Sequence, residues 1–354
     1  MAIDGSFSMK ALVLESKGTP FILKNVNDPK PNDNEAVAKV IACGSGLTIQ
    51  HVRAGRIKVD YPRIIGHEIT AIIEEVGKNV TNVKVGDAVT AYFYLTCGHC
   101  KWCHNNRETL CENFGGYVGR DIDGAYAEYM KLPGENFLKI PESLDWKKNP
   151  AEIAVICDAI ATPFKVIRHA SIKTQDTVAV IGAGGGLGIH MIMMAKWAHS
   201  NVIAVDVASD KFEACKKAGA DICINPRDHN DNQAFYDYTK GMGVDVVIDF
   251  VSSGESLNLG FSILARGGRL VTLGGGGGNQ SVVNANSIDL LNKEAVVMGS
   301  RYATKQEVID SLELVARGDV WPLVTDIRNM AEAEELHKLV EDAKITGRAA
   351  LLIK

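Results

Sequence analysis

The chain has 354 residues, of which 46% are hydrophobic and 23% charged, and its formal net charge is -5 at pH 7. This length exceeds one ordinary hydrophobic core and predicts two domains, while the acidic balance argues against nucleic acid as the main partner. No apolar run approaches the roughly 20 residues that a membrane helix requires, and the N-terminus lacks the order of charges and apolar residues of a signal peptide.

Residues 9–155 are expected to be rich in β-strands joined by many turns. Apolar and β-branched residues predict strands at 9–14, 35–43 and 69–76, and two short strand halves within 83–90 around the turn Gly86-Asp87. Residues 1–8 then precede the first strand as an extension. The sequence shows no internal repeat, and its one low-complexity segment is the glycine run 274–278.

From about residue 160, short apolar runs alternate with helical stretches. Helices are expected at 186–199 and 209–218, and strands at 177–181, 201–205, 222–224, 244–250, 269–273 and 295–298. This alternation is typical of the α/β class, with a parallel sheet covered by helices on both faces. The end of the chain returns to mixed character and finishes in a strand at 349–353. We therefore expect a nucleotide-binding domain at 160–298, inserted into a first domain formed by 1–159 and 299–354.

A glycine-rich turn joins the strand at 177–181 to the following helix. Gly182, Gly184 and Gly188 give the spacing G-x-G-x-x-x-G, one residue longer than the usual dinucleotide fingerprint. Glycine suits this turn because backbone amides must approach a pyrophosphate, whose charge is favoured at a helix N-terminus. Asp206 ends the next strand, where a carboxylate accepts hydrogen bonds from ribose hydroxyls and repels a 2′-phosphate. The segment predicts an NAD site rather than an NADP site; the alternative is an ordinary strand–helix turn with a capping aspartate.

Half of the eight cysteines lie in one short loop. The pattern C-x2-C-x2-C-x7-C is formed by Cys97, Cys100, Cys103 and Cys111. Such tight spacing brings four sulfurs onto one tetrahedral zinc and leaves no open coordination position, so the site is predicted to be structural. His99 and His104 are expected to be bystanders. Iron–sulfur ligation is the alternative, but the proline of the bacterial cluster run is missing. Without a secretory signal, metal thiolates are expected in preference to disulfides, as in a reducing cytoplasm.

A second group of zinc-binding residue types lies nearer the N-terminus. Cys43 and His67 are separated by a segment that also contains Thr48 and His51, a hydroxyl and an imidazole three positions apart. A buried cysteine near a histidine is more often a packing contact, so this pair alone does not establish a metal site.

Taken together, these motifs resemble the zinc-containing medium-chain alcohol dehydrogenases over nearly the whole chain. The resemblance is carried by Cys43-Gly44, Thr48, His51, Gly66-His67-Glu68, the four-cysteine loop, the glycine-rich turn and Asp206. It implies a β-rich GroES-like catalytic domain, a Rossmann coenzyme domain with a doubly wound parallel sheet, NAD as coenzyme and two zinc ions per chain.

In that family a catalytic zinc is held by a cysteine, by the histidine of the G-H-E motif and by a residue at the start of the coenzyme domain. The resemblance places these ligands at Cys43, His67 and Asp158. Cys157 is the alternative for the third ligand, and Glu68 is a supporting or occasional ligand. Three protein ligands leave one zinc position open for water or substrate.

The proton of a bound alcohol also needs a route to solvent. The resemblance implies that Thr48 supplies a relay hydroxyl and that His51, of a residue type whose ordinary pKa is near 6.5, is the surface-facing base, linked through the nicotinamide ribose. Both could otherwise be ordinary strand-end residues. Coenzyme contacts are implied for Gly182, Gly184, Gly185, Gly186, Leu187, Gly188, Asp206, Lys211 and Arg348.

Two positions depart from the family pattern. Ile49 stands where relatives carry an aspartate that supports the zinc histidine, and Leu47 cannot make the side-chain contact to pyrophosphate that many relatives make. Both changes make the pocket region more apolar.

Three residues match or adjoin substrate-pocket positions of the family: Ile57, Phe93 and Tyr94. They favour an apolar or aromatic substrate, with core packing as the alternative explanation. The glycine run 274–278 is expected to be either a loop near the nicotinamide or a long turn.

The resemblance therefore implies a zinc-dependent oxidoreductase that transfers a hydride between an alcohol and NAD and gives an aldehyde or ketone. The alcohol could be secondary, cyclic or aromatic. One alternative is an NADPH- or NADH-dependent enone reductase of the same superfamily, which would need no zinc; Cys43, His67 and Asp158 argue against it. Another is a non-catalytic zinc protein that senses NAD; Thr48 and His51 favour an enzyme. The analogy adds a cytoplasmic homotetramer or homodimer with a small-molecule substrate and no nucleic-acid or membrane partner.

Overall fold

A computed structural model describes residues 8–228, 232–274 and 281–353. The chain divides into two compact units: unit 1 consists of Met1–Ala161 and Thr304–Lys354, and unit 2 of Thr162–Ala303. The expected N-terminal extension, except residue 8, and residues 275–278 of the glycine run lie outside the described residues. Within the described ranges, no helix is long and apolar enough to cross a membrane.

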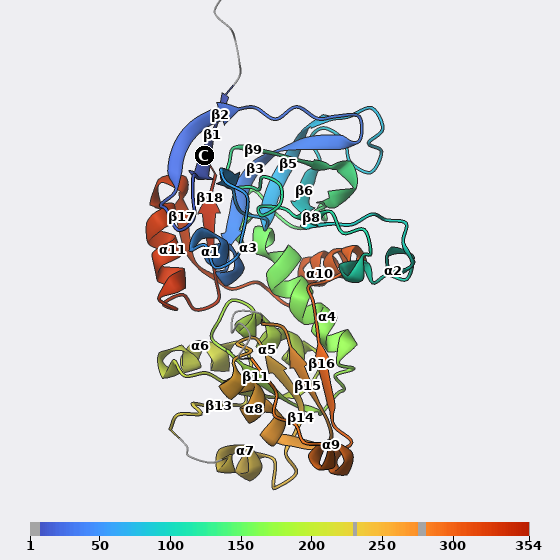
Figure 1. Cartoon of the computed structure of the whole chain (residues 1–354), viewed down its shortest axis with the longest axis vertical. Helices are drawn as coiled ribbons and strands as arrows, with labels where there is room; N and C mark the ends of the chain where they lie inside the picture. Colours follow the sequence, from blue (N-terminus) through green and yellow to red (C-terminus); the bar gives the residue numbers. More distant parts are fainter. Residues whose placement is uncertain (1–7, 229–231, 275–280, 354) are drawn as a thin grey trace, which may run out of the picture. The chain divides into compact units, whose positions relative to one another are not determined.

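Unit 1 is organised around a mostly antiparallel seven-stranded sheet with the path β10-β6-β5-β3-β18-β17, in which β9 also pairs with β3. The strands are β3 (Glu35–Ser45), β5 (Ile69–Val76), β6 (Ala88–Ala91), β9 (Tyr129–Pro133), β10 (Phe137–Lys139), β17 (Val324–Asn329) and β18 (Arg348–Leu352). The last strand of the chain thus lies directly beside β3, and C-terminal residues complete the sheet of the first unit (Figure 1).

The other elements of unit 1 surround this sheet. They are the strands β1 (Ser8–Leu14), β2 (Ile22–Asn27), β4 (Arg63–Ile64), β7 (Tyr94–Leu95) and β8 (Gly116–Tyr117), and the helices α1 (Leu47–Arg53), α2 (Lys101–His104), α3 (Pro150–Val155), α10 (Lys305–Ala316) and α11 (Ala333–Glu341). A π-helical turn, Ile156–Ile160, continues α3. Helix α11 packs beside α1, and both lie near β18 (Figure 1).

Unit 2 contains a six-stranded parallel sheet in the order β13-β12-β11-β14-β15-β16. These strands are β11 (Thr177–Ile181), β12 (Asn201–Val205), β13 (Ile222–Ile224), β14 (Val244–Asp249), β15 (Leu264–Thr272) and β16 (Val296–Gly299). In chain order this is 3-2-1-4-5-6, the doubly wound arrangement of dinucleotide-binding folds. The accompanying helices are α4 (Ala161–His169), α5 (Gly188–Trp197), α6 (Phe212–Lys217), α7 (Gln233–Tyr238), α8 (Gly254–Ser262) and α9 (Ser287–Lys293). The predicted fold class, a β-rich domain plus a doubly wound parallel sheet, is confirmed.

The expectation of two strand halves within residues 83–90 is wrong in its first half. Only β6 forms there, and it is preceded by a turn in which Lys84 N donates to Asp87 Oδ2 at 3.0 Å and Asp87 N donates to Lys84 O at 3.1 Å. Val83 is buried without being in a strand. Its apolar character therefore reflects core packing from a loop, which a β-propensity pattern cannot distinguish from a strand.

Candidate functional site

Strand register brings the first group of candidate ligands together. Cys43 on β3 pairs with Ile69 on β5 and with Leu351 on β18. The Gly44 amide donates to the Glu68 carbonyl at 2.8 Å. The residues just before β5 and the first residue of β18 therefore lie at the same end of β3, although more than 270 positions separate them in the sequence.

His67, Glu68 and Asp158 form a compact group of potential metal ligands. Their ligand atoms all lie within 4.8 Å of one another. Asp158 reaches the group from the π-helical turn after α3, a kind of turn that often occurs at functional sites. The Glu68 Oε2 atom is buried and has no hydrogen-bond partner among the described residues. A Cβ on Gly44 would lie 2.2 Å from this oxygen, so glycine is what makes room for the carboxylate.

Arg348 lies against the two carboxylates of this group. Its Nη2 atom is 2.5 Å from Asp158 Oδ2 and 2.8 Å from Glu68 Oε1, and the residue is 5% exposed. Burial raises the pKa of Glu68 to about 8 despite the opposing effect of Arg348, and burial lowers the pKa of His67 to about 4. Buried carboxylates are costly unless a positive charge compensates them, so this donor set suits a bound cation.

Cys43 is next to this group but outside it. Its Sγ atom lies 3.6 Å from the Gly44 carbonyl. Burial raises the pKa of its thiol, while the backbone amides of Glu68 and His67 act in the opposite direction. The Cys157 thiol instead donates to the Ala154 carbonyl at 3.5 Å, within its own helix. A sulfur, an imidazole and carboxylates on one buried edge are the donors that zinc takes in proteins.

The aromatic residues expected in the substrate pocket lie in two places. The Phe93 ring packs on the ring of His67 with centroids 4.1 Å apart. Tyr94 also contacts Phe93, but it belongs to an aromatic cluster with Phe114 and Tyr117, at 5.3 and 4.9 Å. Ile57 is half-buried. The structure thus brings Phe93 to the metal-ligand group, whereas Tyr94 faces the four-cysteine loop.

Helix α1 carries both relay candidates. Thr48 is exposed in its first turn, and Ile49 next to it is buried at 2% exposure. His51 is half-buried, and its Nδ1 atom accepts a hydrogen bond from Arg56 Nε at 2.7 Å. Sequence analysis missed Arg56, because its significance depends on a partner 285 positions away, Glu341.

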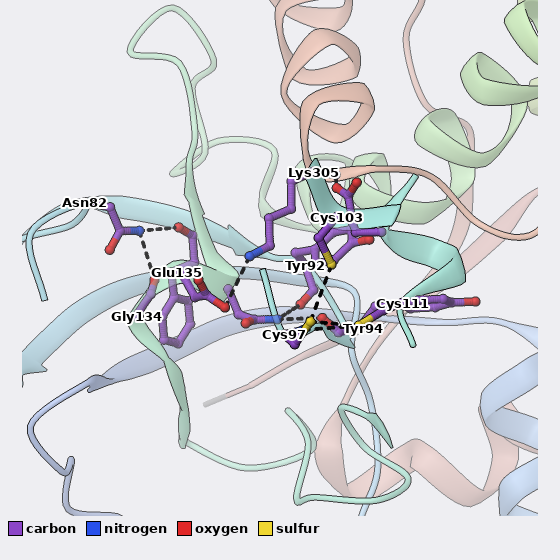
Figure 2. Close-up of polar contacts among 12 residues, drawn as sticks. Asn82, Tyr92, Tyr94, Cys97, Cys103, Cys111, Gly134, Glu135 and Lys305 are labelled. Carbon is purple, nitrogen blue, oxygen red and sulfur yellow. Dashed lines mark hydrogen bonds and ion pairs between the residues drawn. The ribbon is translucent and has the colours of Figure 1, made fainter. Parts of the chain in front are cut away.

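The four cysteines of the loop come together as predicted, and they are the other group of potential metal ligands found among the described residues. Neighbouring sulfurs are 3.5 to 4.0 Å apart. Zinc–sulfur bonds of about 2.3 Å at tetrahedral angles put sulfurs about 3.8 Å apart, so these distances fit one zinc. Figure 2 shows Cys97, Cys103 and Cys111 converging close to Tyr94. His99 and His104 are exposed and lie outside the sulfur group.

Several contacts hold the segment that leads into the four-cysteine loop. The amide of Asn136 donates to the carbonyls of Tyr92 and Tyr94 at 2.6 and 2.9 Å. Lys305, at the start of α10, lies over the Tyr92 ring and pairs with Glu135 at 3.6 Å (Figure 2). The backbone amide of Lys305 also donates to Glu108 Oε1 at 2.5 Å, so the loop itself is anchored to the start of α10.

The glycine-rich turn of unit 2 has the close contacts of a pyrophosphate cradle. A Cβ on Gly188 would lie 2.0 Å from the Gly182 carbonyl, and one on Gly184 would lie 2.5 Å from Lys211 Cδ. The Asp206 carboxylate accepts the Gly184 amide at 2.8 Å and the Ala208 amide at 3.0 Å, which fixes it at the end of β12. The arrangement fits a dinucleotide, with the phosphates on the turn and a ribose near Asp206.

Comparison with known proteins agrees with this geometry. Residues 32–142 match the family model for the alcohol dehydrogenase GroES-like domain, and residues 186–317 match the model for zinc-binding dehydrogenases. An alcohol dehydrogenase from Geobacillus stearothermophilus is 34% identical over 355 residues, covering 98% of this chain and 99% of that protein. An acryloyl-coenzyme A reductase from Sulfurisphaera tokodaii is 30% identical over 346 residues, covering 96% and 98%.

A solved structure is similar over the same length. The crystal structure of an NAD-dependent alcohol dehydrogenase covers 98% of this chain and is itself covered completely (100%), with a TM-score of 0.88 and 26% identity. Sequence motifs, fold and relatives agree, and the chain belongs to the family of zinc-containing medium-chain alcohol dehydrogenases.

Proposed function

We propose that the chain is a zinc- and NAD-dependent alcohol dehydrogenase that interconverts an alcohol with its aldehyde or ketone. The observation that carries this proposal is the group formed by the buried His67 and Glu68 and the half-buried Asp158 beside Cys43. Zinc held by Cys43, His67 and Asp158 would supply a Lewis acid that lowers the pKa of a bound hydroxyl, and NAD would supply the hydride acceptor.

The residues of the chain supply the remaining functions. Arg348 holds both Asp158 and Glu68 in place through the ion pairs already described. Phe93 packs on His67 and forms an apolar wall, which favours an apolar or aromatic substrate. Thr48 and His51 lie on one helix and provide a hydroxyl and a base for the departing proton.

Absorbance at 340 nm with NAD and a panel of primary, secondary, cyclic and aromatic alcohols tests this activity. Turnover of at least one class is expected, together with two zinc ions per chain in elemental analysis, one of them in the four-cysteine loop. Absence of turnover with all alcohols while NAD still binds would contradict the proposal and favour an NAD sensor. A single zinc per chain would contradict the assignment of one of the two metal sites.

An acyl-coenzyme A or enone reductase is the second candidate, because one relative that spans nearly the whole chain is named as an acryloyl-coenzyme A reductase. The metal-ligand group argues for the dehydrogenase, since reduction of an activated alkene needs no Lewis-acid metal. Oxidation of NADH with acryloyl-coenzyme A that survives removal of zinc by a chelator, with no alcohol turnover, would favour the reductase.

We also propose that the protein is a homo-oligomer whose chains pair through unit 2. Strand β16 is at the edge of the parallel sheet, and Val296 and Val297 on it are 43% and 39% exposed. Ile288 and Leu291 on the adjacent helix α9 are 65% and 74% exposed. An apolar edge strand is a template for pairing with another chain, here a second copy. Light scattering should give a dimer or tetramer, and Val297→Lys should reduce the mass; a monomeric parent chain would contradict this.

A reducing compartment such as the cytoplasm fits the thiol chemistry. The cysteines of the loop have the spacing of a shared metal and none is in a disulfide.

A further inference from the structure

His51 is held by a neighbour that can only donate hydrogen bonds. Arg56 Nε donates to His51 Nδ1 at 2.7 Å. A guanidinium has no acceptor atom, so Nδ1 must present its lone pair, and the remaining proton of a neutral imidazole is on Nε2. His51 therefore cannot take up a proton at Nδ1 until Arg56 moves away.

Glu341, the last residue of α11, fixes Arg56 in this position. Arg56 Nη1 and Nη2 each lie 2.6 Å from one of the two oxygens of Glu341, a bidentate pair. Hydrogen bonds from Arg56 and Gln50 lower the pKa of Glu341 to about 2, so the carboxylate remains charged over the working range of an enzyme. The pair is a preorganised clamp on the exposed side of His51.

A chain of hydrogen bonds connects Glu341 to the buried residues of unit 1, and each donor and acceptor in it can be assigned as far as Tyr126. Gln50 Nε2 donates to Glu341 at 2.7 Å, and Gln50 Oε1 lies 2.7 Å from His337 Nδ1, which therefore donates to it. His337 Nε2 then accepts from the Tyr126 hydroxyl at 2.8 Å, and Tyr126 also bonds the Ser45 hydroxyl. Gln50, His337, Tyr126 and Ser45 are all at most 2% exposed.

The inner end of this chain lies at the candidate zinc site. A Cβ on Gly66 would be 2.6 Å from the Tyr126 ring and 2.8 Å from Cys43 Sγ, so the ring and the sulfur approach the same glycine. The network thus runs from Tyr126, which lies near Cys43, to the imidazole of His51, and it positions Glu341 from the buried side.

We propose that Arg56, held by Glu341, is a positioning residue that keeps His51 in its neutral form with the proton on Nε2 and so sets the lower pH limit of the proton relay. The inference rests on the proposed function of His51 as the relay base. With Arg56 in place, a proton can bind His51 Nδ1 only if the Arg56 guanidinium moves away. The imidazolium that forms then lies near the positive charge of Arg56.

The charges around His51 agree with this role. Burial and then the positive charge of Arg56 lower the pKa of His51, while Glu341 raises it. Among the other charged residues of α1 and α11, Arg53 pairs with Glu334, and Glu335 pairs with Arg328 of β17. Arg56 is therefore the cation that opposes protonation of His51.

The test compares Arg56→Gln with the unmodified enzyme. The Arg56 side chain is 43% exposed, so the variant should fold. The acid limb of the pH profile of kcat/KM for alcohol oxidation should move to higher pH, so the ratio of activity at pH 8 to activity at pH 6 increases severalfold. Arg56→Lys, which keeps the charge, should restore part of the parent profile. Arg317→Gln, which removes an exposed arginine that pairs with Asp319 just after the end of α10, is the matched control and should leave the profile unchanged.

NMR of the ring nitrogens of His51 in the full-length enzyme provides a readout independent of turnover. The parent should show the Nε2–H tautomer, and Arg56→Gln should titrate at higher pH; an Nδ1–H tautomer in the parent or an unchanged titration would overturn the inference. His51→Gln separates the two levels of the argument. If it leaves the acid limb in place, the relay assignment fails; if it removes the limb but Arg56→Gln does not move it, only the role of Arg56 fails.

Discussion

The two candidate metal sites of unit 1 are assembled in different ways. The four cysteines come from one loop of fifteen residues, 97–111, and their sulfurs meet at 3.5 to 4.0 Å. The other site takes its residues from the end of β3, the pair before β5, the π-helical turn after α3 and the start of β18. Loop spacing can specify the first site, whereas the second exists only when the seven-stranded sheet has formed in the correct register.

The largest effect is expected at the assembled site. Asp158→Ala removes a carboxylate from the group with His67 and Glu68, and it leaves Arg348 with one partner instead of two. We expect kcat/KM for alcohol oxidation to fall by more than about 100-fold, the upper end of what loss of a supporting residue costs at a metal site. Elemental analysis should show the loss of one zinc per chain.

Cys157→Ala is the matched control for that variant. Its thiol is buried and bonded to the Ala154 carbonyl, so its removal should retain both zinc ions and most of the activity. The reverse pattern, with zinc lost from the Cys157 variant and retained in the Asp158 variant, would show that the third ligand is the cysteine.

A substitution in the loop should instead act on stability. Cys111→Ser leaves the sulfur group with three members, and the metal contributes to folding because its ligands converge only in the folded loop. We expect a loss of several kcal/mol in the free energy of unfolding, below the about 10–16 kcal/mol seen for isolated zinc fingers, because the Lys305 amide still anchors Glu108 of the loop.

Chemical denaturation and metal analysis measure this together. The zinc that remains should be the one at the assembled site, so activity at low temperature should persist. If Cys111→Ser abolished turnover without changing stability, the distinction between a structural and a catalytic metal would be wrong.

The same contrast explains what the sequence could predict. The four-cysteine cluster and the strands 177–181, 201–205 and 222–224 depend on local spacing and apolar pattern, and the structure has them where expected. The group at Cys43, His67 and Asp158 could be predicted only through the family resemblance, because no local pattern shows that β5 pairs with β3 or that the turn after α3 lies beside them. The ion pair of Arg56 and Glu341 could not be predicted, because neither residue belongs to a sequence motif and only the fold brings them together.

The coenzyme site of unit 2, like the four-cysteine loop, is formed by residues close together in the sequence, and a substitution of Asp206 tests it. The carboxylate is fixed by two backbone amides at the end of β12, which directs it to one position. Asp206→Ala should lower the preference for NAD over NADP, measured as the ratio of kcat/KM values, by about 10- to 100-fold, the equivalent of about 1.5–3 kcal/mol for a charged hydrogen bond. The matched variant Asp210→Ala, four residues further along, should leave the ratio unchanged. A constant ratio in Asp206→Ala would remove this residue from the coenzyme site.

The smallest effect, a change in the pH dependence of the unfolding free energy, is expected at the buried residue His337. Burial lowers the pKa of His337 to about 3, well below its ordinary value of 6.5. Below pH 6.5 the unfolded chain therefore binds a proton that the folded chain does not, so this residue reduces stability progressively as pH falls from 6.5 toward 3. His337→Gln keeps a donor for Gln50 and an acceptor for Tyr126 but has no titration. Between pH 7 and pH 5 the parent should lose about 2 kcal/mol more unfolding free energy than the variant. Urea denaturation at the two pH values measures this difference. Equal losses would mean that His337 is protonated in the folded chain and that its Nε2 donates to the Tyr126 hydroxyl instead of accepting from it.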